Sequence, residues 1–187
     1  SIAYYKDNAK EQTLNNFTFN GKGYSIYYNL GGTEEVFNIK NSIINSTINN
    51  GNTGAINVDN SDIKSNSIWN DSSGKILVNN SRISNIYGIY NKGEMTIGNS
   101  NISNTSTSSV TIRNYLKMQI NDTIISNIEI RNGTDNGVGI TTISGNTVIN
   151  VTNSNSRAIY NNSGTININN VEATSVNDTI YNNYDDG

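Results

Sequence analysis

Short alternations of apolar and polar residues recur along the chain at nearly constant spacing. The clearest copies begin at Gly54, Gly74 and Gly93 and read Gly-x-φ-x-φ-x-Asn-Ser-x-φ, where φ is an apolar residue. The phrase returns every 19 to 25 residues. A period of this length, made of strands too short to fold alone, predicts a stack of repeated coils, each burying its apolar face against its neighbours.

Alignment of the copies separates inward from outward positions. With the Gly position counted as zero, position +4 is apolar in all eight copies: Phe19, Ile39, Val58, Val78, Ile97, Ile120, Ile143 and Ile168. Position +9 is also apolar: Tyr24, Ile44, Ile63, Ile83, Ile102, Ile125, Val148 and Ala173. Position +3 is mostly polar, so the φ-x-φ segment has the period of a strand with one buried face. The first copy is placed at Asn15, with Phe17 at +2.

A second phrase, Ile-x-Asn, precedes each Gly position. Its copies are Ile48-Asn-Asn50, Ile68-Trp-Asn70, Ile89-Tyr-Asn91, Ile112-Arg-Asn114, Ile130-Arg-Asn132, Ile159-Tyr-Asn161 and Ile180-Tyr-Asn182. Each coil therefore contains an Ile-x-Asn strand, a φ-x-φ strand and a third short apolar strand after the Asn-Ser turn. Three parallel strands per coil predict an all-β, single-stranded parallel β-helix (β-solenoid) of about eight coils, on the order of 40 Å long.

Composition agrees with a solenoid and excludes several functions. Only 34% of the 187 residues are hydrophobic, yet only 14% are charged and the net charge is −3. The chain has no Pro, as expected when nearly every strand donates hydrogen bonds to a neighbouring coil. It also lacks Cys and His, the commonest metal ligands and general bases, so we expect no metal and no cofactor. The acidic pI argues against nucleic acid, and no apolar run is long enough to insert directly into a membrane.

The repeat does not cover the chain evenly. Residues 1–16 fit it least and are predicted to be an N-terminal cap or linker, whereas residues 17–187 form the β-helix, interpreted as a fragment of a longer rod. Two segments lengthen the later coils and are predicted to be projecting loops: the Ser/Thr-rich residues 104–109 and the Gly-rich residues 133–139. Uncapped solenoid ends or edges also favour self-association.

The phrases resemble a known class of repeat. Gly88–Ser100 and Ala158–Asn170, both containing Ile-Tyr-Asn followed by φ-x-φ, carry the likeness best. They are similar to the right-handed parallel β-helix (pectin-lyase-like) repeats of bacterial surface adhesins and autotransporter passengers. The resemblance covers roughly residues 15–182 and implies a right-handed helix and a secreted or cell-surface location. It says more about fold than about function.

One outward column is the candidate binding site. If Ile faces inward, the x of Ile-x-Asn faces outward. Six members of this column are aromatic or basic: Trp69, Tyr90, Arg113, Arg131, Tyr160 and Tyr181. Aromatic faces stack on sugar rings and Arg binds carboxylate or sulfate, so a glycan- or protein-binding stripe is one interpretation. The other is a purely structural ladder in which the side chains stack from coil to coil.

A column of Asn is predicted to be structural. At position +6, stacked amides would bond to one another at the turn: Asn41, Asn60, Asn80, Asn99 and Asn170. No two carboxylates align on neighbouring coils, so no catalytic residue is assigned, although Glu129 and Asp135 flank the Gly-rich loop.

Three functions remain open at this stage. The favoured one is a bacterial cell-surface adhesin or stalk fragment that binds host or matrix glycan or protein through a side face of the solenoid. A carbohydrate-active enzyme of the same fold, either a polysaccharide lyase or a hydrolase, and a purely structural spacer are the alternatives.

Overall fold

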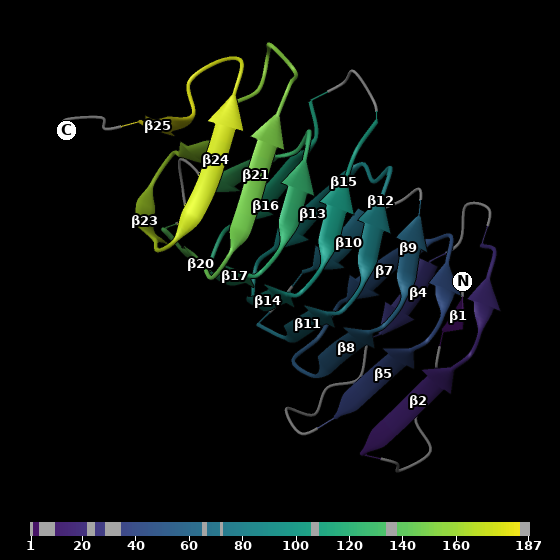
Figure 1. The fold of residues 1–187 in the computed structure, drawn as a ribbon. Coiled ribbons are helices and arrows are strands. Elements are labelled where there is room, and N and C mark those ends of the chain that lie inside the picture. Colours follow the sequence, from purple (N-terminus) through teal and green to yellow (C-terminus); the bar gives the residue numbers. More distant parts are fainter. Residues whose placement is uncertain are drawn as a thin grey trace.

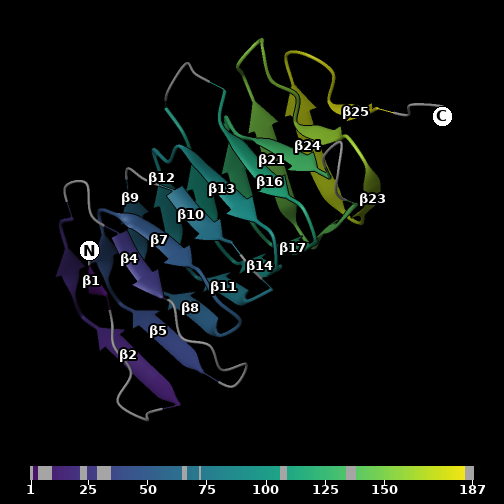
Figure 2. The ribbon, with the colours of Figure 1, turned by 180° about the vertical axis from the view of Figure 1, so that it is seen from behind.

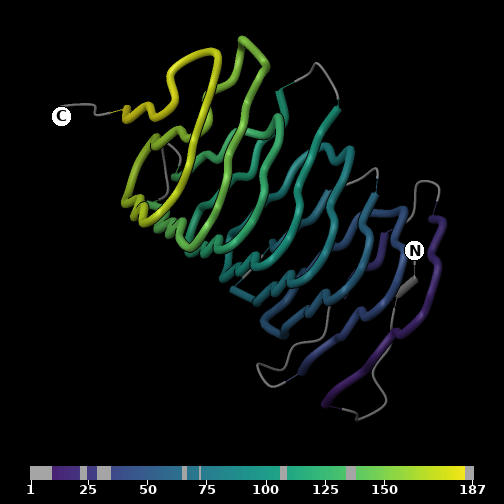
Figure 3. The backbone as a smooth tube through the Cα atoms, viewed as in Figure 1, coloured from purple at the N-terminus to yellow at the C-terminus, as the bar shows by residue number. Residues whose placement is uncertain are grey.

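The computed structural model describes residues 2–3, 10–21, 25–28, 35–64, 67–71, 73–105, 109–133 and 138–183. These residues form a β-solenoid of about seven turns, built from three parallel sheets and containing no helix (Figure 1). The view from behind and the tube through the Cα atoms show the coils stacked in chain order from the N-terminal to the C-terminal end (Figures 2 and 3). The predicted all-β, solenoid fold is confirmed.

Each coil contributes one strand to each sheet. The Ile-x-Asn sheet contains β1 (Ile2–Ala3), β4 (Ser25–Tyr28), β7 (Thr47–Asn50), β10 (Ser67–Asn70), β13 (Gly88–Asn91), β16 (Thr111–Asn114), β19 (Glu129–Asn132), β22 (Ile159–Asn161) and β25 (Ile180–Asn182). The φ-x-φ sheet contains β2 (Glu11–Asn15), β5 (Val36–Lys40), β8 (Ala55–Asp59), β11 (Lys75–Asn79), β14 (Glu94–Gly98), β17 (Lys117–Asn121), β20 (Gly139–Ser144) and β23 (Gly164–Ile168). The third sheet contains β3 (Thr18–Phe19), β6 (Ile43–Ile44), β9 (Asp62–Lys64), β12 (Arg82–Ser84), β15 (Asn101–Ser103), β18 (Ile124–Ser126), β21 (Thr147–Val151) and β24 (Val171–Ser175).

Apolar columns fill the space between the three sheets. Val58, Val78 and Ile97 pair in register in the φ-x-φ sheet and are at most 1% exposed. Ile63 and Ile83 do the same in the third sheet, fully buried. Each buried aliphatic side chain contributes roughly 1.5–3 kcal/mol, so these columns stabilise a chain whose overall hydrophobicity is low.

The first repeat lies five residues earlier than the sequence alignment placed it. Leu14, not Phe19, pairs with Ile39, and Gln12, not Phe17, pairs with Phe37. Phe19 instead begins the third-sheet column by pairing with Ile44, the place predicted for Tyr24. Since β2 pairs with β5, the parallel ladder begins before residue 17, inside the segment predicted to be a cap or linker.

The sequence alignment also misplaced the register of β21 by one residue, because the turn before it is longer. Ile149, not Val148, pairs with Ile125 in the third sheet. The turn before β21 has one more residue than its neighbours, with Gly145 in the left-handed region and Thr147 in the place of the usual Ser. Parts of the two predicted loops, residues 106–108 and 134–137, lie outside the described residues.

The turn between the φ-x-φ sheet and the third sheet is the same in nearly every coil. Its first residue has a positive φ of 46° to 54°, a conformation that Asn tolerates better than most residues: Asn16, Asn41, Asn60, Asn80, Asn99, Asp122 and Asn170. The next residue is a buried Ser or Thr in most coils. Ser61 shows the pattern: its hydroxyl donates to the Asp59 carbonyl at 2.8 Å and accepts from the Ser42 backbone N–H at 3.1 Å.

Candidate functional site

The predicted stripe forms one continuous column on the outer face of the Ile-x-Asn sheet. Coil-to-coil pairing brings together Tyr27, Asn49, Trp69, Tyr90, Arg113, Arg131, Tyr160 and Tyr181. All six residues singled out in the sequence belong to it. Tyr27 was missed because its strand carries Tyr28 where the other copies have Asn. From Trp69 to Tyr181 the side chains are half-buried, although they point outward.

Aromatic rings of neighbouring coils stack on one another. The Trp69 and Tyr90 rings lie 3.9 Å apart between centroids, with an interplanar angle of 13°. Tyr160 and Tyr181 stack at 5.3 Å and 13°. Stacking along the solenoid axis covers the ring faces and turns the ring edges toward solvent, so a sugar ring has little aromatic face on which to lie.

The guanidinium groups continue the stack between the two aromatic pairs. Arg113 lies over the Tyr90 ring at 5.9 Å, and Arg131 lies over the Tyr160 ring at 4.8 Å. Each contact contributes about 0.5–1 kcal/mol at an exposed site. The structure therefore brings the predicted residues together as a stacked ladder.

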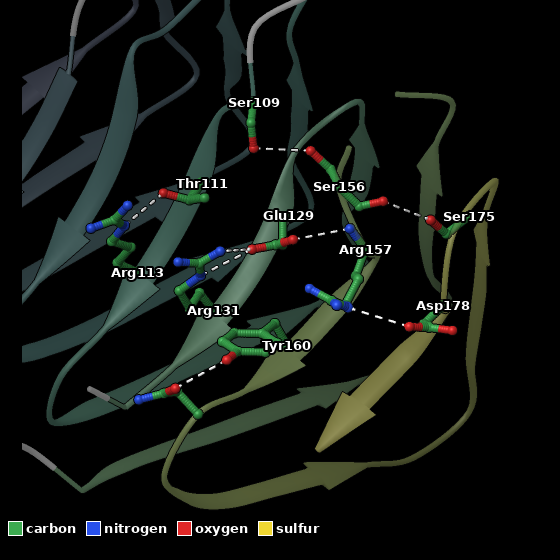
Figure 4. Close-up of polar contacts among 11 residues, drawn as sticks. Ser109, Thr111, Arg113, Glu129, Arg131, Ser156, Arg157, Tyr160, Ser175 and Asp178 are labelled. Carbon is green, nitrogen blue, oxygen red and sulfur yellow. Dashed lines mark hydrogen bonds and ion pairs between the residues drawn. The ribbon is translucent and has the colours of Figure 1, made fainter. Parts of the chain in front are cut away.

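A buried carboxylate holds the C-terminal half of the stripe (Figure 4). The Glu129 side chain is only 2% exposed. Its Oε1 accepts hydrogen bonds from Arg131 Nε at 3.0 Å and Nη2 at 2.7 Å, and its Oε2 accepts one from the Arg157 backbone N–H at 2.9 Å. Both oxygens of this buried charge are therefore satisfied, as a stable buried ion pair requires.

Arg157 is a neighbour of the stripe that the sequence pattern did not single out. It lies outside the Ile-x-Asn phrase, in the connection from β21 to β22, yet its guanidinium lies 4.2 Å from the Tyr181 centroid and 5.3 Å from that of Tyr160. Its Nε also contacts Asp178 Oδ2 at 3.5 Å. Ser156 fixes the same connection, because its hydroxyl lies 2.9 Å from the Ser109 hydroxyl and its carbonyl accepts from Ser175 at 3.1 Å (Figure 4).

Arg113 has a different environment from the other two arginines. Its Nε donates to the Thr111 hydroxyl at 3.0 Å, and its remaining contact is the Tyr90 ring. Thr111 occupies the position that Glu129 fills one coil later. Within the described part of the chain, Arg113 therefore has no carboxylate partner, whereas Arg131 and Arg157 each have one.

The Asn column predicted at position +6 does not form a continuous ladder. Its residues are exposed, and only the Asn60 amide donates to the Asn41 side-chain oxygen, at 2.6 Å. Asn41, Asn80, Asn99 and Asn170 donate instead to residues outside the column: Asn15, Asp59, Asn79 and Asn146. What these positions share is the positive φ, so their common role is to fit the turn.

The continuous Asn ladder lies at the last position of Ile-x-Asn. Each amide nitrogen donates to the side-chain oxygen of the next coil, at 2.7 to 3.1 Å, along Asn70, Asn91, Asn114, Asn132, Asn161 and Asn182. Asn70, Asn91, Asn114 and Asn132 are fully buried. The same amides also donate to backbone carbonyls, for example Asn70 to Gly74 at 2.8 Å and to Glu94 at 3.1 Å. The turn after Asn70 also requires Gly74, since a Cβ on it would lie 2.0 Å from the backbone carbonyl oxygen of Asn52.

Other polar groups do not assemble a second centre in the described residues. No group of three or more acidic side chains there is arranged to hold a metal ion. The Asn146 backbone N–H donates to Asp122 at 3.0 Å and lowers the pKa of that carboxyl, which is fully exposed. Asp135, which flanks the Gly-rich loop together with Glu129 in the sequence, lies outside the described residues, and Glu129 itself accepts hydrogen bonds from Arg131 and Arg157.

Comparison of the chain with protein-family models, curated proteins and solved structures finds no match. The fold and the stacked column by themselves define the class of the protein: a parallel β-solenoid with an outward ladder of aromatic and arginine side chains. Among the described residues, no helix has the length and apolar character needed to cross a membrane.

Proposed function

We propose that this protein is a non-catalytic, rod-like binding module of a bacterial cell surface, either an adhesin or a stalk that displays one. Support comes from the repeat, whose phrases resemble those of pectin-lyase-like surface solenoids, and from the rigid outward column that the fold builds. Such a rod offers a long side face to a host or matrix partner and needs no enclosed pocket.

The stripe is the observation that carries this proposal. Trp, Tyr and Arg are the residue types most enriched at the energetic centres of protein interfaces. Here they occupy one column over six neighbouring coils, from Trp69 to Tyr181. Because stacking already restricts their rotamers, binding through this face would lose little side-chain entropy.

Removal of the first aromatic pair tests the proposal. We expect the double variant Trp69→Ala, Tyr90→Ala to lose most of its binding to immobilised matrix proteins or to a glycan array. The matched control is Tyr87→Ala, because Tyr87 is 76% exposed and lies outside the stripe. Circular dichroism and thermal melting establish that each variant is folded. Unchanged binding by a folded double variant would refute the role of the stripe.

The stacked geometry also favours a second candidate, a structural spacer. All ring and guanidinium contacts of the stripe are made within the solenoid, which is what a ladder that only stiffens the rod requires. A spacer predicts that the double variant melts at lower temperature while no ligand in either panel binds the wild type. The wild type, the double variant and Tyr87→Ala therefore also distinguish a binding module from a spacer.

A further inference from the structure

Arg113 leaves a positive charge uncompensated in the middle of the stripe. Arg131 is neutralised by the buried Glu129, and Arg157 by Asp178, whereas Arg113 contacts only a hydroxyl and a ring within the described part of the chain. In Figure 4, Arg113 lies on the coil beyond Arg131, away from the carboxylate that serves its neighbour. This charge stands out because the whole chain is acidic, with a net charge of −3.

The same position places the guanidinium on a rigid support. Arg113 Nε is held by Thr111 of its own strand, and the cation rests against Tyr90 of the preceding coil. The η nitrogens make no hydrogen bond to the protein among the described residues, so their donors remain for a ligand. A guanidinium with free η nitrogens matches a carboxylate, which accepts two parallel N–H bonds.

The stacking decides which kind of carboxylate ligand fits. A sugar ring is usually recognised by lying flat on an aromatic face, but the facing surfaces of Trp69 and Tyr90 are in contact with each other at 3.9 Å. Tyr90 is covered on its other side by Arg113. The stripe therefore presents ring edges, a phenol hydroxyl and guanidinium donors, which are the groups that anchor protein partners.

We propose that Arg113, flanked by the edges of Tyr90 and Trp69, is a docking point for an acidic segment of a protein partner. A glutamate or aspartate of the partner accepts hydrogen bonds from the η nitrogens of Arg113, because Nε already donates to Thr111. This inference rests on the proposed function of a side-face binding module and adds the chemistry of the partner.

The test uses two capped, fluorescein-labelled ten-residue peptides, one alternating Glu and Ser and the other alternating Gln and Ser. We expect the Glu peptide to bind the wild-type protein in low-salt buffer with saturable fluorescence anisotropy, at least about tenfold tighter than the Gln peptide. R113Q should lose this preference, and R113K should retain part of it because a lysine keeps the charge without the planar fork. The matched control is R82Q, since Arg82 is an exposed arginine on the third sheet.

The outcomes distinguish this inference from the function on which it rests. Equal binding of the Glu peptide by folded R113Q and wild type overturns the docking point. Binding of an oligogalacturonate, but not of the Glu peptide, in an Arg113-dependent manner overturns the acidic protein segment as occupant and leaves side-face binding intact. If neither probe binds while the Trp69→Ala, Tyr90→Ala variant still loses adhesion, the inference fails and the proposed function stands.

Discussion

The side-chain amide of Asn70 donates a 2.9 Å hydrogen bond to the side-chain oxygen of Asn91 in the next coil. Asn91 is fully buried and donates in turn to the carbonyls of Gly93 and Lys117 and to the Asn114 side chain. The substitution Asn91→Asp keeps the shape but replaces these donors with a charged acceptor. We expect it to lower the free energy of unfolding by at least about 3 kcal/mol, measured by urea denaturation.

Asn99→Asp is the control for that substitution. Asn99 is exposed and its amide makes a long, 3.4 Å contact with Asn79, so the change should cost less than about 0.5 kcal/mol. Similar losses at the two positions would contradict the assignment of Asn91 to a buried ladder and of Asn99 to a surface turn.

The positive φ of Asn80 predicts a backbone effect. At φ 49°, Asn80→Ala should destabilise the protein by about 1 kcal/mol, because a Cβ without a compensating side-chain bond disfavours the left-handed region. Asn80→Gly loses the same 2.9 Å bond to Asp59 but tolerates this φ, so it should cost clearly less. Thermal melts of the two variants give the comparison, and an equal cost would mean that the lost hydrogen bond, not the conformation, dominates.

Glu129 should hold the connection between β21 and β22 against the sheet. In Glu129→Gln the carboxylate that accepts from Arg131 and Arg157 is lost, and we expect a cost of about 1.5–3 kcal/mol. Faster hydrogen exchange of the Arg157 amide would identify the local cause. Glu94→Gln is the matched control: Glu94 pairs with Lys75 and Lys117 at 3.6 and 3.8 Å on an exposed face, a geometry worth about 0–1 kcal/mol.

Tyr28 predicts a loss of stability in alkali. It is 2% exposed, and burial, together with the charge of Glu35, raises the pKa of its phenol to about 12. Between pH 10 and 12 the unfolded chain releases this proton while the folded chain keeps it, so stability falls as pH rises, on the order of 1 kcal/mol. The difference between the absorbance titrations of the wild type and Tyr28→Phe isolates this phenolate, and Tyr28→Phe should flatten the pH dependence of the melting temperature. A difference curve with its midpoint near pH 10 would contradict the prediction.

Hydrophobic periodicity predicted the sheets because every coil repeats the same inward residues. The alternation that places Val78 inside also places Leu77 outside, and in the structure Val78 is buried while Leu77 is exposed. Periodicity failed at the first coil because Phe17 and Phe19 imitate the φ-x-φ spacing, although Leu14 occupies that column. A short apolar alternation such as that of Phe17 and Phe19 does not by itself indicate which of two adjacent strands contains it.

The sequence contained the information needed to tell which of the two Asn columns is buried, but the ladder was predicted at the wrong column. Successive residues of a strand alternate between faces, so the Asn of Ile-x-Asn must lie on the same side as its buried Ile. This rule predicts Asn91 inside, beside Ile89, and both are fully buried. The stacking of Trp69 on Tyr90 could not be derived in this way, because it depends on side-chain rotamers that the alternation leaves undetermined.

The amides of the Asn ladder, from Asn70 to Asn161, all donate in the same direction along the chain, each to the Asn of the following coil. A formed coil therefore presents a donor to the coil that follows it in sequence, which needs only to supply an acceptor and a fresh donor. Folding by sequential docking in the direction of synthesis would match this polarity, with each coil acting as the template for the next.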